Sequence, residues 1–296
     1  MKQVLNINSV NDYVEYVGAE VLHSQIGIIH YDELQACRHS LNNYEVYGLF
    51  IMEESPYTIT YGQGTYDFKN YSLLSVAPGQ MGGVSDNGEI IHLKGWVLLF
   101  SPQLLVGTPL AKIIDDYHFF SYYQTEALHM ENEEWKTITN IIKIMRNELR
   151  LHLDAPRQRE ILTSYLQLIL EYCSRFYLRQ FQTETEEANS DLLKRFNKIL
   201  KDYYKDKKQI KLGIPTVKYC AQELFLSPNY FGDLIRQLTG DSASHTIRKF
   251  VLQYGKTLLN EGKTVSETAR TLGFSYPQHF TRMFKKQFGF PPTHKA

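Results

Sequence analysis

The sequence predicts a multi-domain α+β protein, with a strand-rich N-terminal domain that ends in a helix pair and an all-helical C-terminal domain. Three observations predict it. Short runs of β-branched and aromatic residues recur over about residues 20–105, the apolar period becomes helical at about residue 131, and the net charge reverses sign near residue 190. A chain of 296 residues is long enough for two domains, since domains usually run ~100–200 residues.

Five apolar runs mark the predicted strands of the N-terminal domain. Turns that contain glycine or proline separate the runs, which is the punctuation of a β-sandwich or a β-barrel. The runs cover residues 26–31, 46–52, 57–61, 71–77 and 96–100. We therefore expect a barrel or a sandwich over about residues 20–105.

Two amphipathic helices are expected over about residues 131–181. Both carry apolar residues at alternating spacings of three and four, which is the period of a helix that packs along one stripe. The first stripe comprises Trp135, Ile138, Ile142, Met145 and Leu149, and the second comprises Leu162, Tyr165, Ile169, Tyr172 and Phe176. Two interpretations stay open: the pair packs on its own strands, or the second helix also pairs with another copy of the chain. Apolar residues on its other side (Ile161, Leu168, Tyr177 and Phe181) favour a homodimer, with the second stripe as its interface.

The boundary between the domains is predicted from polarity and charge. Residues 182–190, QTETEEANS, contain no large apolar side chain and are expected to be a linker between domains 1–181 and 191–296. From residue 190 onward the chain has 19 lysines and arginines against 8 aspartates and glutamates, a net charge of +11; residues 1–189 have 13 against 24, a net charge of −11. A basic module in a soluble protein indicates a nucleic-acid partner.

The remaining composition argues against membranes, metals and catalysis. No apolar stretch approaches the ~20 residues of a membrane helix, and the N-terminus lacks the apolar core of a signal peptide, so a cytoplasmic location is expected. The three cysteines are scattered without a CxxC pair. The histidines form no HxH pair, and no nucleophile or phosphate-loop motif occurs. We expect no enzyme, catalytic residue, metal site or cofactor.

A weak internal repeat in the C-terminal domain predicts two helix-turn-helix units, over residues 216–240 and 264–289. Each begins with a threonine that can cap a helix and ends with a glycine that can terminate one. Each places a small alanine, Ala221 or Ala269, where two helices must approach closely. The second helix of such a unit presents its polar face to a DNA major groove. In the second unit that face comprises Gln278, His279, Thr281, Arg282, Lys285 and Lys286.

The segment GFSYPQHFTRMFKKQFGFPP, residues 273–292, resembles the signature of AraC/XylS-type transcription regulators. The resemblance covers about residues 191–296 and implies that a long helix, residues 244–260, joins the two units. It places the base-reading side chains at Asn229, Gly232 and Asp233 in the first unit and at Pro277, Gln278 and Arg282 in the second. This chain departs from the family pattern at Gly232, Asp233, Val251 and Gly255. Gly255 in a helix indicates either tight packing or a change without a structural reason.

The N-terminal half resembles, more loosely, the cupin-like sensor domain of such regulators. The VAPGQ turn at 76–80 and the GWVLLFSP strand at 95–102 carry this resemblance. It implies a cupin-like β-barrel that binds a small-molecule effector, and a solid core without a ligand is the alternative. Taken together, we expect a sequence-specific transcription regulator that binds duplex DNA as a homodimer. RNA polymerase is a further candidate partner, and control by an effector or a constitutive action both stay open.

Overall fold

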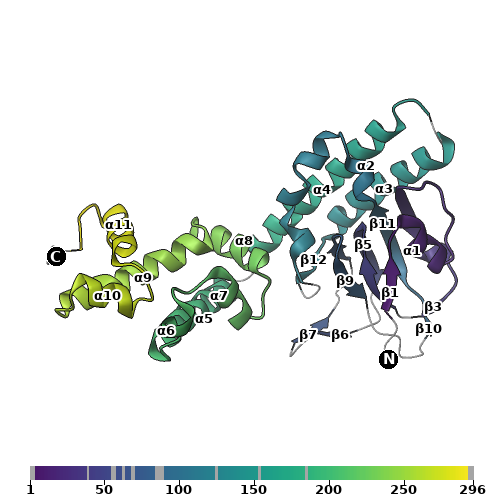
Figure 1. The fold of residues 1–296 in the computed structure, drawn as a ribbon. Coiled ribbons are helices and arrows are strands. Elements are labelled where there is room, and N and C mark those ends of the chain that lie inside the picture. The colour runs from purple at the N-terminus through teal and green to yellow at the C-terminus, as the bar shows by residue number, and fades with distance from the viewer. Residues whose placement is uncertain are drawn as a thin grey trace. The chain divides into compact units, whose positions relative to one another are not determined.

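The computed structural model describes residues 4–38, 40–54, 58–61, 64–67, 71–83, 90–123, 126–152, 155–183 and 186–292. The chain divides into two compact units, Met1–Gln180 and Phe181–Ala296, which are described separately (Figure 1). Strands lie in the first unit and the second is helical, which confirms the mixed α+β class. Within the described ranges, no helix has the length and apolarity that a membrane span requires.

A five-stranded antiparallel sheet is the centre of the first unit. Its order is β12 (Leu128–His129), β8 (Ser72–Val76), β5 (Tyr47–Glu54), β11 (Lys94–Phe100) and β2 (Ile26–His30). Four of the five apolar runs predicted to be strands, those of β2, β5, β8 and β11, therefore lie in one sheet. In β11, Trp96 lies opposite Ile51 of β5 and His30 of β2. Residues 95–100 of β11 are all buried, as expected of a central strand.

Three smaller sheets complete the strand pairing. β1 (Val4–Ile7) is parallel to β4 (Leu41–Tyr44), which is antiparallel to β9 (Gln80–Gly83). β3 (Cys37–Arg38) pairs with β10 (Ile90–Ile91), and β6 (Thr58–Tyr61) pairs with β7 (Gly64–Asp67). In the described ranges these pairings give open sheets, not the closed barrel that the sequence led us to expect.

Helix α1 (Val10–Tyr16) closes one side of the strand core. Ser9 and Asp12 form a reciprocal capping box that fixes its start. A Cβ built on Gly27 of β2 would lie 2.8 Å from the Val10 side chain, so only glycine allows this approach of helix and strand. Short helical turns follow the sheet: η1 (Tyr31–Glu33), α2 (Pro102–Leu105), η2 (Pro109–Lys112), η3 (Ile114–Asp116) and η4 (His118–Ser121).

Helices α3 (Asn132–Leu151) and α4 (Gln158–Thr183) form an antiparallel pair. Arg179, near the end of α4, bonds to Glu134, near the start of α3, through Nε at 2.8 Å. At the other end, the Gln158 amide donates to the His152 carbonyl oxygen at 2.6 Å. The predicted stripe of α3, from Trp135 to Leu149, is buried, so the first helix packs within its own chain.

The segment predicted to be a linker is mostly helical. α4 continues through residues 182–183, and α5 (Glu186–Lys205) already includes residues 186–190. Residues 184–185 lie outside the described ranges. Polarity alone therefore did not identify an extended connection.

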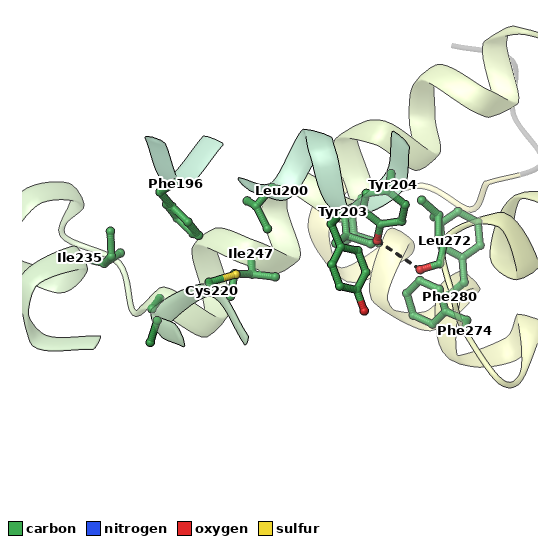
Figure 2. Packing of buried hydrophobic residues seen from close by; sticks show 14 of the residues in the cluster. Phe196, Leu200, Tyr203, Tyr204, Cys220, Ile235, Ile247, Leu272, Phe274 and Phe280 are labelled. Carbon is green, nitrogen blue, oxygen red and sulfur yellow. Dashed lines mark hydrogen bonds between the residues drawn. The ribbon is translucent and has the colours of Figure 1, made fainter. Parts of the chain in front are cut away.

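The second unit consists of helices around one apolar core (Figure 2). After α5 come α6 (Gln209–Leu212), α7 (Val217–Glu223), α8 (Pro228–Thr239), α9 (Ala243–Asn260), α10 (Val265–Thr271) and α11 (Pro277–Phe288). The core includes Phe231 of α8 and Phe280 and Phe284 of α11, all nearly inaccessible. Both predicted helix-turn-helix units therefore share one core with α5 and α9.

Candidate nucleic-acid interface

The helix pairs α7–α8 and α10–α11 are built alike. The Thr216 hydroxyl accepts a hydrogen bond from Tyr219 N at the start of α7, and the Thr264 hydroxyl accepts one from Glu267 N at the start of α10. Ala221 and Ala269 are fully buried, as expected where two helices cross closely. Gly240 and Gly289 end α8 and α11 in the left-handed conformation, with φ of 74° and 83°.

The two turns differ by one residue. Leu224 ends α7 and Ser227 caps α8, whereas Leu272 ends α10 and Tyr276 precedes α11. Both second helices begin with a proline, Pro228 or Pro277, at the position where its fixed φ suits a helix start. Counting from these prolines, Asn229 corresponds to Gln278, Gly232 to Thr281, Asp233 to Arg282, Arg236 to Lys285 and Gln237 to Lys286.

The outward face of α11 is polar and strongly basic. The predicted residues Pro277, Gln278, His279, Arg282, Lys285 and Lys286 are all exposed. Thr281 is half-buried, and its hydroxyl donates to the Pro277 carbonyl oxygen at 3.1 Å. No ion pair to Arg282, Lys285 or Lys286 occurs among the described residues. Three cations on one helix face are thus available to an anionic partner.

The outward face of α8 is less charged. Asn229 is exposed, whereas Gly232 and Asp233 are half-buried. A Cβ built on Gly232 would meet no atom within 4 Å, so this part of the face is bare backbone. Arg236 is exposed and corresponds to Lys285, and the sequence reasoning missed it. Its position three residues after Asp233, on the same face, is the signal that would have found it.

The first helix of each unit starts next to an exposed lysine. Lys218 lies in the first turn of α7, and Lys263 directly precedes the Thr264 cap of α10. In a helix-turn-helix the first helix crosses the DNA backbone, and a helix N-terminus favours phosphate. These two lysines extend the basic surface beyond the second helices.

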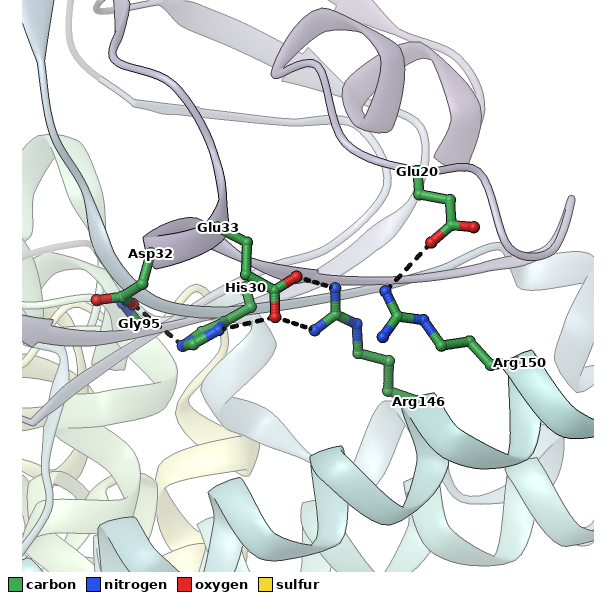
Figure 3. Close-up of polar contacts among 7 residues, drawn as sticks. All are labelled: Glu20, His30, Asp32, Glu33, Gly95, Arg146 and Arg150. Atoms are coloured by element: carbon green, nitrogen blue, oxygen red, sulfur yellow. Dashed lines mark hydrogen bonds and ion pairs between the residues drawn. The ribbon is translucent and has the colours of Figure 1, made fainter.

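A polar cluster in the first unit ties η1 to α3 (Figure 3). The Arg146 guanidinium donates to the Glu33 carboxylate, at 2.7 Å through one nitrogen, and lies over the Trp96 ring. The hydrogen bond from Arg146 holds the pKa of Glu33 at about 2, well below its usual value. The His30 ring stacks on Trp96 and stands between Asp32 and Glu33, at 3.1 and 3.3 Å. This arrangement joins sheet and helix.

The described residues of the first unit hold no cluster of metal ligands, and the cavity beside Tyr31 and His92 is small. No group of three or more histidine, cysteine or carboxylate side chains suited to a metal ion occurs in the described ranges. A cavity of about 170 Å³ is lined by residues that include Tyr31, His92 and Lys94, below the ~300 Å³ at which ligand pockets usually begin. Tyr13, Tyr44 and Phe50 pack ring against ring in the interior.

The stripe of α4 that we expected to form a dimer interface belongs mainly to the chain's own core. Leu162 and Ile169 are fully buried and Phe176 nearly so, while Tyr165 and Tyr172 are half-buried. Because burial within the chain removes them from a partner, the first three do not lie on a free face. The exposed apolar residues of α4 include Ile161 and Leu168, beside a surface groove of about 600 Å³ that also contacts Tyr165.

The chain is similar in sequence or fold to several known proteins. A helix-turn-helix domain family matches residues 220–295. The uncharacterised transcriptional regulatory protein YesN of Bacillus subtilis is 29% identical in an alignment of 125 residues that covers 38% of this chain. The chain spans about a third of the length of YesN, 32%. ToxT of Vibrio cholerae aligns with 91% of this chain and 96% of its own, with 13% identity and a TM-score of 0.28. Its unsaturated fatty acid bound form aligns with 91% and 92%, with 11% identity and a TM-score of 0.29.

Proposed function

We propose that the protein is a sequence-specific transcription regulator of the AraC/XylS family that binds duplex DNA, since a helix-turn-helix domain family matches its residues 220–295 and part of the chain is similar to a transcriptional regulatory protein. The observation that carries the proposal is the pair of polar helix faces, α8 and α11, built on one core. Helix α9 joins them, and its 18 residues span ~27 Å at ~1.5 Å per residue. Two recognition helices on successive turns of one DNA face stand ~34 Å apart, which α9 and the helix radii together can provide.

Within this proposal, α11 supplies most of the affinity and specificity. Arg282 can bond both acceptors of a guanine, and Gln278 can pair with an adenine. Lys285 and Lys286 lie a turn further along the same face, where they suit phosphates together with Thr281 and His279. Pro277 starts the helix and offers only apolar contact, since it has no N–H donor.

The α8 unit has a different character. Asn229 can pair with adenine, and Asp233 can accept from the amino group of cytosine but repels phosphate. Gly232 offers no side chain, so this unit reads few bases and depends on Arg236 and Lys218 for phosphate contacts. The two half-sites of an operator would therefore contribute unequally to affinity.

A salt titration of duplex binding by the full chain tests the proposal. Counterion release makes the logarithm of affinity fall linearly with the logarithm of salt concentration, with a slope of about −0.9 for each phosphate neutralised. With Arg236, Lys218, Lys263, Lys285 and Lys286 on phosphates, we expect a slope of about −4 to −5 for each chain bound. A selected duplex should bind at least ~10³-fold more tightly than a random one at the same salt. Binding that is insensitive to salt would refute the proposal.

We further propose that the protein is a homodimer through the exposed side of α4. Ile161, Tyr165, Leu168 and Tyr172 follow one another at spacings of four, three and four, and therefore form one stripe. If two copies of α4 pack antiparallel with their centre near Gln167, Ile161 of one copy lies opposite Tyr172 of the other, and Tyr165 lies opposite Leu168. The same pairing brings Glu160 to within two residues, ~3 Å along the helix axis, of the position opposite Arg175, twice by symmetry. This self-complementarity of shape and charge supports a two-fold interface.

The first unit is proposed to be a cupin-like sensor, with a small-molecule effector as its ligand. The strand-rich architecture supports the assignment, while the packed ring cluster of Tyr13, Tyr44 and Phe50 favours the constitutive alternative. Thermal unfolding of the full chain in the presence of a metabolite panel separates the two. RNA polymerase is the expected downstream partner of either form.

A further inference from the structure

The α5–α6 segment, residues 186–213, is attached to the second helix-turn-helix unit by a buried hydrogen bond. The Tyr204 hydroxyl donates to the Leu272 carbonyl oxygen at 3.2 Å (Figure 2). Leu272 ends α10, so its carbonyl has no partner within that helix. Tyr204 is almost completely buried, and burial raises the pKa of its hydroxyl, which keeps the group protonated as a donor.

A backbone contact reinforces this attachment. A Cβ built on Gly273, in the turn between α10 and α11, would lie 2.7 Å from the carbonyl carbon of Gly213. Gly273 also has a φ of 87°, which favours glycine. The carbonyl oxygen of Gly213 accepts a hydrogen bond from the Tyr203 hydroxyl at 2.9 Å. This bond holds in place the Gly213 backbone that Gly273 contacts.

The same segment is attached to the first helix-turn-helix unit. The ring of Phe196 in α5 packs edge-on against Phe231 of α8, with 5.1 Å between centroids. Tyr203 packs likewise against Tyr219 of α7 at 4.8 Å. The Lys208 ammonium donates to the Tyr219 hydroxyl at 2.7 Å. The α5–α6 segment therefore contacts both units and bridges them independently of α9.

We infer that the α5–α6 segment is a second strut that fixes the separation and rotation of α8 and α11, and that Tyr204 is a positioning residue for operator spacing. This inference rests on the proposed function. If α9 were the only connection, the second helix-turn-helix unit could bend or twist relative to the first about its packing on Gly255. Attachment through both α9 and the α5–α6 segment prevents this motion. One extra base pair moves a half-site by ~3.4 Å and turns it by ~35°, so a rigid pair cannot seat both helices on it.

The test measures how the full chain tolerates a change in half-site spacing. A tight-binding duplex is selected from a random pool, its two half-sites are located by footprinting, and one base pair is inserted between them. The readout is the ratio of the Kd for the lengthened duplex to the Kd for the selected one. Tyr204→Phe removes only the hydroxyl. We expect it to lower this ratio by about 2- to 12-fold, the range that corresponds to one net hydrogen bond.

The control is Tyr254→Phe, which also removes one tyrosine hydroxyl. The Tyr254 ring lies 5.1 Å from that of Tyr204, and its hydroxyl forms no hydrogen bond among the described residues. This variant should leave the ratio at the wild-type value. Both variants should bind a duplex with only the α11 half-site as the wild type does. Tyr203→Phe, which frees the Gly213 carbonyl, should lower the ratio in the same direction and serves if Tyr204→Phe does not fold.

Three outcomes count against the inference. An unchanged ratio in Tyr204→Phe and Tyr203→Phe overturns it. An equal loss of affinity for every duplex, with the ratio unchanged, shows a purely structural role and also overturns it. A wild-type chain that prefers no duplex sequence refutes the proposed function itself, and that result is visible before any variant is made.

Discussion

Gly255, in the middle of α9, lies directly against Leu272 at the end of α10. A Cβ built on Gly255 would stand 2.8 Å from the Leu272 Cδ1 atom and 3.0 Å from Cε2 of Phe280. Glycine inside a helix costs roughly 0.5–1 kcal/mol relative to alanine, so its presence needs a compensating contact. The contact is the close packing of the second helix-turn-helix unit on α9, which decides between the two explanations of this glycine left open by the sequence.

Two alanine substitutions should therefore change stability in opposite directions. Gly255→Ala gains helix propensity but overpacks the core, and overpacking typically costs about 1–3 kcal/mol, so a net loss of about 0.5–2 kcal/mol is expected. Gly232→Ala, in α8, meets no neighbour and should gain about 0.5–1 kcal/mol. Urea unfolding of the full chain, followed by helical circular dichroism, measures both. Equal effects of the two substitutions would contradict the packing argument.

Arg282 and Lys286 should contribute to binding in different ways. Arg282→Ala is expected to cost about 1–3 kcal/mol on the selected duplex and to relax the preference at one base pair. Lys286→Ala should weaken selected and random duplexes alike and reduce the salt slope by about one. Fluorescence anisotropy with both duplexes over a range of salt concentrations separates the two effects. Equal losses on both duplexes for both variants would show that Arg282 reads no base.

Arg236→Ala extends this comparison to the first unit. Because Arg236 corresponds to Lys285, we expect it to contact phosphate, so its loss should weaken every duplex about equally and reduce the salt slope by about one. Lys205, exposed on α5, provides a control lysine outside the two helix-turn-helix units. Lys205→Ala with the same effect as Arg236→Ala would indicate unspecific charge attraction in place of a defined contact.

The sequence predicted what depends on local pattern. The five apolar runs became strands because alternation and turn residues specify them locally, and the outward face of α11 followed from Phe280 and Phe284, which orient the opposite side. The strand β1 and its parallel pairing with β4 were missed, since a four-residue strand that pairs across more than thirty residues leaves no local signal. Parallel pairing of this kind depends on tertiary packing.

The α4 helix shows a second limit of prediction from the sequence. Its apolar residues lie on two sides, and a helical period cannot tell which side meets the chain's own core. The structure buries Leu162 and Ile169 and exposes Ile161 and Leu168, although the two pairs are adjacent in sequence. The linker prediction depended on polarity, which does not distinguish an extended connection from a polar helix such as the start of α5. The family resemblance placed base-reading side chains only at Asn229, Gly232 and Asp233, so Arg236, nearly one turn after Asp233 on the same face, was missed.

The Glu33–Arg146 pair predicts a pH dependence of stability. The pKa of Glu33 is lowered to about 2, chiefly by the hydrogen bond from Arg146, whereas an unfolded glutamate titrates near 4.5. A depressed carboxyl pKa gives stability that is fully present above the unfolded pKa and is lost as pH falls toward the folded one. The unfolding free energies of the wild type and Arg146→Gln should therefore converge as pH falls from about 4.5 to about 2.

Arg150→Gln is the matched control for this experiment. Arg150 lies on the same helix and pairs with Glu20 at 3.1 Å, but both side chains are largely exposed (41% and 64%), so the pair is screened by solvent. Its removal should change stability little at any pH. Urea titrations at pH 6, 4, 3 and 2 provide the comparison. A difference between wild type and Arg146→Gln that stays constant over this range would assign the effect of Arg146 to its packing on Trp96 alone.

Leu168 and Ile169, adjacent on α4, should respond differently to the same substitution. Leu168 is 43% exposed on the proposed interface, so Leu168→Glu should leave the fold intact and reduce the mass in light scattering from that of two chains to one chain of 34.5 kDa. Ile169 is fully buried, so Ile169→Glu, which places an unpaired charge in the core, should unfold the first unit.

The Glu160–Arg175 charge pair provides a sharper test of the dimer. Glu160→Arg alone and Arg175→Glu alone should weaken the dimer, and the double exchange should restore it. A wild-type chain that remains a monomer at all concentrations, or a double exchange that fails to recover the dimer, would exclude the antiparallel α4 arrangement.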